Sequence, residues 1–366
     1  MLNPQINSPR DTGIRRKLAG RLARSRKDVY CLLAIASGLL ITACGSSSQR
    51  VSAVSATAVA RWAPAWHVPR VLDLSAARRD GAIAVATAGH LALLAPGGAL
   101  RPFARGAGGY SSPGGEEPYI ALSSGRRVPG AGCRFAADTL YALRLSAHPG
   151  VTAIDAQGRA SVFASVPARG LENGIAFDDE GRFENRLLVT ATAGSHTSVY
   201  AIDCRGAVST VTRNAPKVEG GLAVAPETFG RFGGDLIAPD ENSGRIYAIA
   251  PDGRSQTLAS SGLPHGGDVG VESAGFVPRR FARGWSALVA DRLTPGNPHP
   301  GDDAILRIEA RALHAAGVRE GDLLVATEGG AYTDAIACAA SCVVRHVADG
   351  PAVAHLEGHI TFSAAP

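Results

Sequence analysis

The segments EPYIAL (117–122), ENGIAF (172–177), EGGLAV (219–224), ESAGFV (272–277) and EGHITF (357–362) share one pattern, a glutamate that leads into a short apolar run. The first four begin roughly 50 residues apart, and a longer interval separates the fourth from the fifth. A repeat of this length is typical of a four-stranded β-propeller blade. The repeated glutamate marks an equivalent position in each unit.

The same order of strand-like runs follows within each unit. These runs are short, rich in Val, Ile and Tyr, and bounded by Gly, Pro and Asp, which favours strands over helices. Residues 309–317 are an exception and are predicted to be helical. Second strands are expected at 140–145, 187–192, 235–240 and 287–292, and third strands at 151–155, 199–203, 246–250 and 304–309.

The two ends of the chain complement each other. Residues 356–362 supply a first strand with nothing after it, whereas residues 81–106 supply three strands with no glutamate strand before them. We therefore expect the C-terminal strand to pair with the N-terminal blade and close the ring, which would hide exposed sheet edges.

The interval between Glu272 and Glu357 contains more strands than one blade needs. After blade five it holds DLLVATEGG (322–330), DAIAC (334–338) and CVVRHVA (342–348), which resemble a sixth blade without an acidic first strand. The fold class is therefore expected to be all-β, a six-bladed β-propeller. A propeller of five blades with one oversized unit is the alternative.

Residues 1–43 have the features of a lipoprotein signal peptide. A basic stretch precedes the apolar run at 29–41, which is short for a membrane span and ends in ITAC. This ending resembles the bacterial lipobox and implies that Cys44 carries a lipid such as palmitate after cleavage. Residues 44–66 are then expected to be a flexible tether, and residues 67–366 the propeller. The implied location is the cell membrane or outer membrane, with the protein lipid-anchored and facing the periplasm or the cell exterior.

Removal of the signal peptide changes the charge of the chain. The whole sequence holds 37 basic and 32 acidic residues, and residues 1–43 account for 8 and 2 of these. The mature chain therefore carries 29 basic and 30 acidic residues. Because no basic excess remains to neutralise phosphates, nucleic acid is not expected as a partner.

Four cysteines follow Cys44 in the mature chain. An even number in an exported protein favours disulfides over metal ligation. We expect Cys338 to pair with Cys342, and Cys133 to link to Cys204 in a neighbouring blade.

The five repeated glutamates are expected around one mouth of the channel, because first strands line the channel of a propeller. Like charges roughly 8 Å apart repel by about 2 kcal/mol per pair at an effective dielectric near 20. The ring therefore favours a cation, a proton or hydrogen-bond donors, and a hard divalent cation such as Ca²⁺ suits carboxylate and amide oxygens. In the alternative, each glutamate accepts backbone N–H bonds and joins neighbouring blades. The candidate metal ligands are Glu117, Glu172, Asn173, Glu219, Glu272 and Glu357.

Other candidate side chains are expected on the same face. Four histidines lie in equivalent loops between second and third strands, and imidazoles bind metals or exchange protons near neutral pH. His359 follows Glu357 by two residues and is expected to point into the channel with it. The expected ligand-facing residues are His90, His148, His196, Asp240, Asp291, His299, Glu328 and His359.

The pattern IYAIAPDGR (246–254), with PDENSGR (239–245) before it and EGGLAV earlier in the blade, resembles the regucalcin and gluconolactonase type of six-bladed propeller. It is more loosely similar to propellers of the NHL and quinone-dependent sugar dehydrogenase kind. The resemblance implies one divalent cation at the channel mouth, held by a Glu, an Asn and an Asp, and lactone hydrolysis in some members. By position, the matching residues are Glu357 or Glu117, Asn173, and Asp240 or Asp291.

Two functional hypotheses remain open at this level. In the first, the chain is a membrane-anchored propeller that binds a small molecule, glycan or protein, with a divalent cation at the channel mouth. In the second, it is a metal- or quinone-dependent hydrolase or oxidoreductase that acts on a lactone or sugar. The sequence contains no dominant nucleophile or base motif, which favours the first.

Overall fold

The structure is a computed structural model that describes residues 58–88, 90–104, 117–145 and 148–364. The predicted signal peptide, Cys44 and most of the predicted tether lie outside these residues. The described residues belong to one compact unit. None of the helices in the described part of the chain has the length and hydrophobicity that crossing a lipid bilayer requires.

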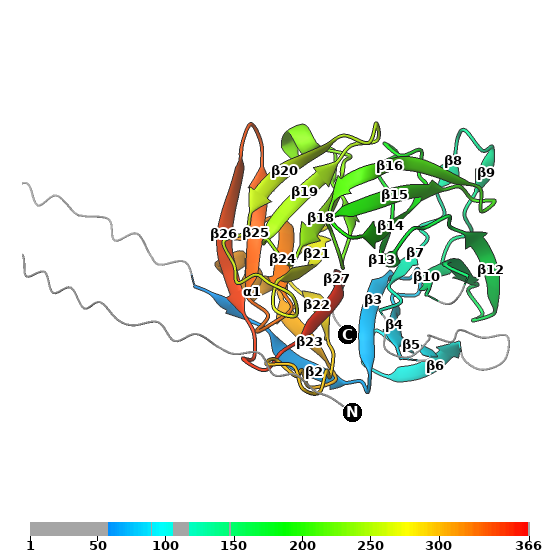
Figure 1. Cartoon of the computed structure of the whole chain (residues 1–366). Helices are drawn as coiled ribbons and strands as arrows, with labels where there is room; N and C mark the ends of the chain where they lie inside the picture. Colours follow the sequence, from blue (N-terminus) through cyan, green and yellow to red (C-terminus); the bar gives the residue numbers. More distant parts are fainter. Residues whose placement is uncertain (1–57, 89, 105–116, 146–147, 365–366) are drawn as a thin grey trace, which may run out of the picture. The chain divides into compact units, whose positions relative to one another are not determined.

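Four sheets each contain four antiparallel strands in consecutive order (Figure 1). The first sheet consists of β3 (Val71–Ala77), β4 (Ile83–Thr87), β5 (His90–Leu94) and β6 (Leu100–Ala104). The second consists of β7 (Ile120–Leu122), β10 (Leu140–Arg144), β11 (Gly150–Ile154) and β12 (Ala160–Ser165), with the hairpin β8 (Arg127–Val128) and β9 (Cys133–Arg134) inserted. The third consists of β13 (Leu171–Phe177), β14 (Leu187–Ala193), β15 (His196–Ile202) and β16 (Val208–Pro216). The fourth consists of β17 (Ala223–Val224), β18 (Leu236–Asp240), β19 (Arg245–Ile249) and β20 (Ser255–Ser260), with the 3₁₀ turn η1 (Gly230–Phe232).

The remaining strands form a nine-stranded sheet that consists of two arrays. A single parallel bridge, between Ala274 and His359, joins the two arrays. One array contains β21 (Val271–Phe276), β24 (Leu323–Thr327), β25 (Thr333–Cys338), β26 (Cys342–Asp349) and β1 (Ala60–Arg61). The other contains β27 (Leu356–Ala364), β22 (Trp285–Asp291), β23 (Ala304–Glu309) and β2 (Ala63–His67). Helix α1 (Ala310–Ala315) confirms the predicted helical stretch.

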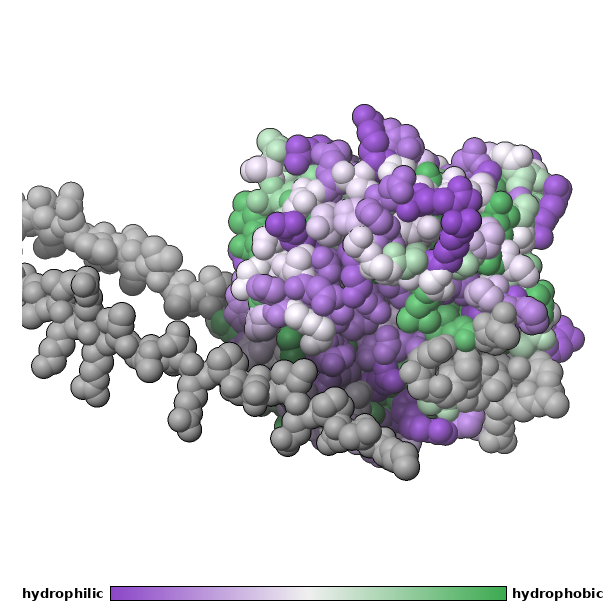
Figure 2. Space-filling view, in the orientation of Figure 1, coloured by the Kyte–Doolittle hydropathy of each residue, from purple (hydrophilic) through white to green (hydrophobic). Residues whose placement is uncertain are grey.

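The inner strands of these arrays form a closed ring. In the described residues β3, β7, β13, β17, β21 and β27 contact one another in that order, and β27 returns to β3. Buried apolar side chains pack between adjacent arrays, and the last such cluster joins Leu288 and Ile305 to Val85. The face seen in Figure 2 is accordingly mainly hydrophilic, with hydrophobic side chains in small separate areas. The predicted all-β propeller is confirmed.

The two chain ends meet in one sheet, but through partners that differ from the prediction. The C-terminal strand β27 pairs with β22, and the N-terminal β2 forms the outer edge of the same array. The first strand beside β4 is β3 instead, which carries no glutamate, because its register with β4 places Leu72 where β21 carries Glu272. The N-terminal blade therefore has its own inner strand, and the pairing expected for 356–362 with 81–106 is wrong.

The strand that contains Glu272 also has a different partner from the one expected. β21 pairs with β24, whereas β22 and β23 belong to the next array and are completed by β27. After β21 the chain forms β22, β23 and α1 in the next array. It then returns with β24 to the blade that contains β21. Residues 60–66, which we assigned to the tether, are strands β1 and β2 except for Trp62, so the propeller begins earlier than residue 67.

Both predicted disulfides are present. Cys133 on β9 bonds to Cys204 in the turn after β15, which joins neighbouring sheets, and Cys338 bonds to Cys342 across the β25–β26 turn. The first bridge spans 71 residues of sequence and the second spans 4. In the loop-closure model the longer loop gives the larger stabilisation.

Replacing both Cys133 and Cys204 by Ser is expected to lower the free energy of unfolding by about 4 kcal/mol. Replacing both Cys338 and Cys342 by Ser is the matched control and is expected to lower it by about 2 kcal/mol. Urea unfolding monitored by circular dichroism measures both values. A larger loss from the second pair would contradict the loop-closure account.

Candidate functional site

Acidic side chains from several blades gather at the end of the ring where the inner strands begin. Glu272 lies on β21, Glu357 lies on β27, and Glu117 and Glu219 precede β7 and β17. Oxygens of Glu117, Glu272 and Glu357 lie within 4.8 Å of one another. Loops after second strands add Glu241 and Glu328. We call these six residues the acidic cluster: Glu117, Glu219, Glu241, Glu272, Glu328 and Glu357.

Tyr119 is at the centre of part of this cluster. Its Oη lies 2.5 Å from Glu272 Oε1, 2.9 Å from Glu117 Oε2 and 2.9 Å from Glu357 Oε2. A phenol has one proton to donate, so only one of these carboxyls can accept it, and the others approach the phenol oxygen favourably only when they are themselves protonated. The geometry therefore requires protons or another cation among these three carboxyls.

The electrostatic environment divides these carboxyls into protonated and ionised groups. Repulsion from Glu357, together with burial, raises the pKa of Glu117 to about 8, and burial raises the pKa of Glu272 well above its usual range. Burial opposes ionisation of Glu357 as well, but hydrogen bonds from His355 and the charge of Arg292 lower its pKa. Glu357 thus accepts the phenol proton, and Glu117 and Glu272 hold protons in the metal-free protein.

Three basic side chains partly neutralise the cluster. Arg292 Nη1 donates to Glu117 Oε1 at 2.5 Å and to Glu357 Oε1 at 2.9 Å. His355 Nε2 lies 2.8 Å from Glu328 Oε1, and the two neighbouring glutamates raise the pKa of His355 to about 10 despite its burial. The ammonium of Lys217 lies 3.8 Å from Glu219 and 3.6 Å from Glu241. In the described residues the cluster therefore holds more carboxyls than cations.

One part of the cluster gathers three carboxyls, of which Glu328 contacts His355 and Glu241 contacts Lys217. Oxygens of Glu241, Glu272 and Glu328 lie within 4.8 Å of one another, and they come from three different segments of the ring. Glu328 is only 5% exposed, yet its Oε2 has no hydrogen-bond partner in the described structure. A buried carboxylate oxygen without a partner is costly, and a hard cation would satisfy it.

Two of the candidate ligands from the sequence lie apart from this set. Glu172 accepts a hydrogen bond from the backbone N–H of Gly150 in the neighbouring sheet at 3.0 Å, as expected for a glutamate that joins blades. Asn173 donates to Val218 O at 2.8 Å, and its Oδ1 accepts from Thr190 at 3.1 Å. Its amide group is thus already occupied by hydrogen bonds.

The predicted ligand-facing residues have diverse positions. Glu328 belongs to the cluster, and Asp291 Oδ1 accepts the backbone N–H of His355 at 2.8 Å, which positions the His355 backbone. Asp240 accepts hydrogen bonds within its own turn from Asn242 and Ser243. The loop histidines are not part of the described groups of metal-ligating side chains, and His299 Nδ1 lies 2.7 Å from Ala352 O. The other three lie exposed near the starts of β5, β11 and β15: His90, His148 and His196.

His359 extends from β27 across the ring and contacts two other inner strands. Its Nδ1 lies 3.0 Å from Asp73 on β3, and its Nε2 lies 3.0 Å from Ile175 O on β13. Burial lowers the pKa of His359, but the Asp73 carboxylate outweighs this effect and raises it. The side chain therefore bridges three inner strands, β27, β3 and β13.

Tyr119, Arg292, His355 and Lys217 were not among the residues singled out from the sequence, whereas Glu241 lies in a loop that the sequence marked beside Asp240. Tyr119 follows Glu117 by two residues, so the strand alternation that placed His359 beside Glu357 would have placed Tyr119 too. The basic residues carry no comparable repeat signal.

Comparisons with known proteins add little beyond the fold. No family model matches the chain, and no curated protein matches it in sequence. Similar solved structures include a nidogen/laminin complex, with 13% identity, a TM-score of 0.48, and coverage of 80% of this chain and 84% of that chain. A gluconolactonase from Xanthomonas campestris has 11% identity, a TM-score of 0.44, and coverage of 80% and 79%. A virginiamycin B lyase from Staphylococcus aureus has 10% identity, a TM-score of 0.42, and coverage of 77% and 87%.

The cluster predicts that the metal-free protein loses stability as the pH rises. Glu117 has a pKa of about 8 in the folded chain, above the ordinary value of 4.5, so its contribution is present at low pH and is lost as the pH rises towards 8. His355 has a pKa of about 10 in the folded chain, so its contribution to stability is likewise lost as the pH rises above its ordinary pKa of 6.5.

Urea unfolding in the presence of a chelator, between about pH 5 and about pH 8, measures this slope. Glu117→Gln removes one titrating group and is expected to flatten the slope, whereas Glu227→Gln, at an exposed position outside the cluster, is expected to leave it unchanged. Equal slopes for Glu117→Gln and the native protein would contradict the assignment.

Proposed function

We propose that this chain is a lipid-anchored, extracytoplasmic β-propeller that binds its ligand at the acidic mouth of the channel through a divalent cation such as Ca²⁺. The cation would be held by Glu241, Glu272 and Glu328. The observation that supports this proposal is the buried, unpartnered oxygen of Glu328 beside two further carboxylates. Calcium takes six to eight oxygen ligands, so three carboxylates leave positions for oxygen donors of a partner.

The ligand class follows from the chemistry of such a cation. Hydroxyl and carboxylate oxygens of a glycan, a small molecule or a protein side chain suit a hard cation with open coordination positions. The hydrogen bonds of His359 to Asp73 and Ile175 O cross the ring, which favours binding at the surface of the mouth over passage through the ring. The cation would therefore act as a docking point between the propeller and its ligand.

One observation favours a hydrolase that acts on a lactone or sugar as a second candidate. His355 is held in its protonated form beside the proposed cation site, and a protonated imidazole can donate a proton to a leaving group. The histidine is only 2% exposed, however, and a substrate could reach it only if the mouth opened. The binding function is therefore the better supported one.

Calcium is expected to raise the melting temperature of the soluble form that begins at Gly45, and EDTA is expected to reverse the effect. Saturation at 100 times the dissociation constant adds about 2.7 kcal/mol to the free energy of unfolding. Elemental mass spectrometry of protein purified without chelator is expected to find about one metal equivalent per chain.

Glu328→Gln keeps the size of the side chain and removes its charge, so it should abolish the calcium-dependent shift while the metal-free protein remains folded. Glu227→Gln, an exposed residue outside the cluster, is the matched control and should keep the full shift. If Glu328→Gln instead lowers stability equally with and without calcium, Glu328 is only a structural partner of His355.

Membrane attachment is tested separately. Cys44→Ala is expected to move the protein from the membrane fraction to the soluble fraction and to abolish incorporation of labelled palmitate. Cys31→Ala, within the apolar run, is the control and should change neither. Membrane association of the Cys44→Ala protein would show that attachment does not depend on the lipid.

A further inference from the structure

The end of the channel opposite the acidic cluster contains a large apolar cavity. Its volume is about 1040 Å³, and His359 lies among its lining residues. Each inner strand contributes an apolar side chain to its wall: Leu74, Leu122, Phe177, Val224, Phe276 and Phe362.

Packing between the blades leaves part of the apolar surface of most of these side chains uncovered. Leu122, Phe177, Val224 and Phe276 are all half-buried, so part of their apolar surface faces the cavity. Covering such surface is worth about 25 cal/mol per Å². A concave apolar cavity of this size is typical of a site for a small molecule or a hydrocarbon chain.

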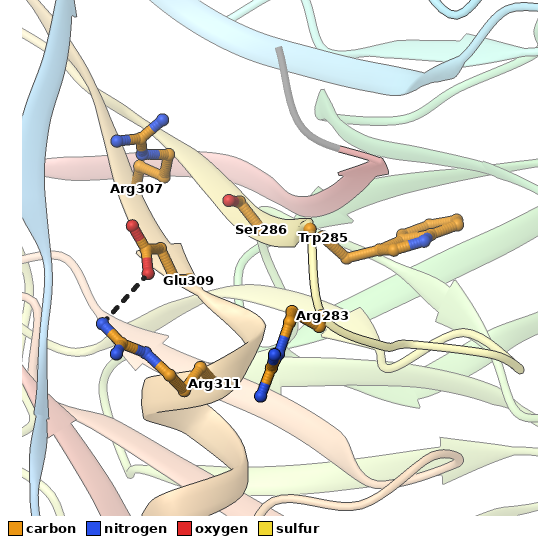
Figure 3. Close-up of a pocket in the computed structure, with 7 residues that line it drawn as sticks. Arg283, Trp285, Ser286, Arg307, Glu309 and Arg311 are labelled. Carbon is orange, nitrogen blue, oxygen red and sulfur yellow. Dashed lines mark ion pairs between the residues drawn. The ribbon is translucent and has the colours of Figure 1, made fainter.

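A second, basic pocket adjoins this cavity. It has a volume of about 520 Å³ and is lined by Arg283, Arg307 and Arg311, with Ser286 and Glu309 (Figure 3). Trp285 lines both hollows, and in Figure 3 its ring extends away from the three arginines. The apolar cavity and the basic pocket therefore meet at this residue.

The arginines of the basic pocket retain unneutralised charge. Arg311 lies 3.6 Å from Glu309, both largely exposed, whereas the described structure gives Arg283 and Arg307 no ion pair. Charged residues of both signs also line the cavity: Asp179, Glu180, Glu320, Arg279 and Arg280. The guanidinium group of Arg307 lies 5.8 Å from the centre of the Trp66 ring, and Arg283 is exposed beside Trp285.

We propose that this end of the channel binds a single-chain anionic amphiphile, with its hydrocarbon chain in the apolar cavity and its head group in the basic pocket. Guanidinium groups bind carboxylate and phosphate oxygens in pairs, which suits such a head group. This site is separate from the cation site, because His359 lies between them, and it does not depend on the proposed function.

Titration calorimetry with laurate, below its micelle concentration, tests the proposal on the soluble form that begins at Gly45. We expect saturable binding with one molecule per chain. The double variant Arg283→Ala/Arg311→Ala should bind laurate at least tenfold more weakly, and its affinity for the uncharged decanol should be unchanged. Arg254→Ala, in the β19–β20 turn, is the control and should bind laurate like the native protein.

A second variant tests the hydrocarbon part of the site. Ala223 lines the cavity, is half-buried and belongs to no buried core cluster, so Ala223→Phe should narrow the cavity without disturbing the core. This variant is expected to bind both laurate and decanol at least tenfold more weakly than the native protein, and circular dichroism checks that it is folded. Absence of saturable laurate binding to the folded native protein, or binding that neither variant weakens, would overturn the proposal.

Vesicles distinguish the two sources of such an amphiphile. Sedimentation with phosphatidylcholine vesicles that contain the single-chain lipid lysophosphatidylglycerol, but not with pure phosphatidylcholine vesicles, would support a lipid of the membrane surface as the ligand if the Arg283→Ala/Arg311→Ala variant loses it. Saturable laurate binding without sedimentation would support a dispersed amphiphile.

Discussion

The contact between Asp73 and His359 is the interaction on which the ring depends. Asp73 is fully buried, and its carboxylate accepts the backbone N–H groups of Leu74, Ile120 and His359 as well as the ring of His359. One side chain therefore joins β3, β7 and β27, and His359 extends the connection to β13. Gly358 is required beside it, because its φ is +66° and a Cβ there would lie 2.3 Å from Asp73 Oδ1.

The burial of the mouth accounts for its chemistry. Glu272, Glu328 and Glu357 are buried, and their carboxyls lie close to one another and to other glutamates. Burial and mutual repulsion raise the pKa of Glu117, Glu219 and Glu272, while Arg292 and His355 keep Glu357 ionised. Some carboxyls of the cluster are therefore protonated when no cation is present, and a divalent cation would replace these protons.

One repeated residue, the glutamate, predicts the propeller and its acidic mouth. The errors in the predicted strand pairing have the same origin. A search for glutamate finds five inner strands and misses β3, because Leu72 stands in the equivalent position, and the search therefore assigns the C-terminal strand to the wrong blade. No sequence pattern predicts that β22 pairs with β27 and that β24 pairs with β21. Because β22 and β24 are equally apolar, only packing determines which inner strand each of them pairs with. Likewise, Arg292 and His355 reach the cluster through the ring geometry, which no local pattern encodes.

The placement of the cation is the central claim, and a crystal structure grown with millimolar Ca²⁺ tests it most directly. The account predicts one ion within 2.3–2.6 Å of oxygens of Glu241, Glu272 and Glu328, a distance range typical of calcium. An ion-free mouth in which these three carboxyls bond only to one another, to water or to basic side chains would contradict it.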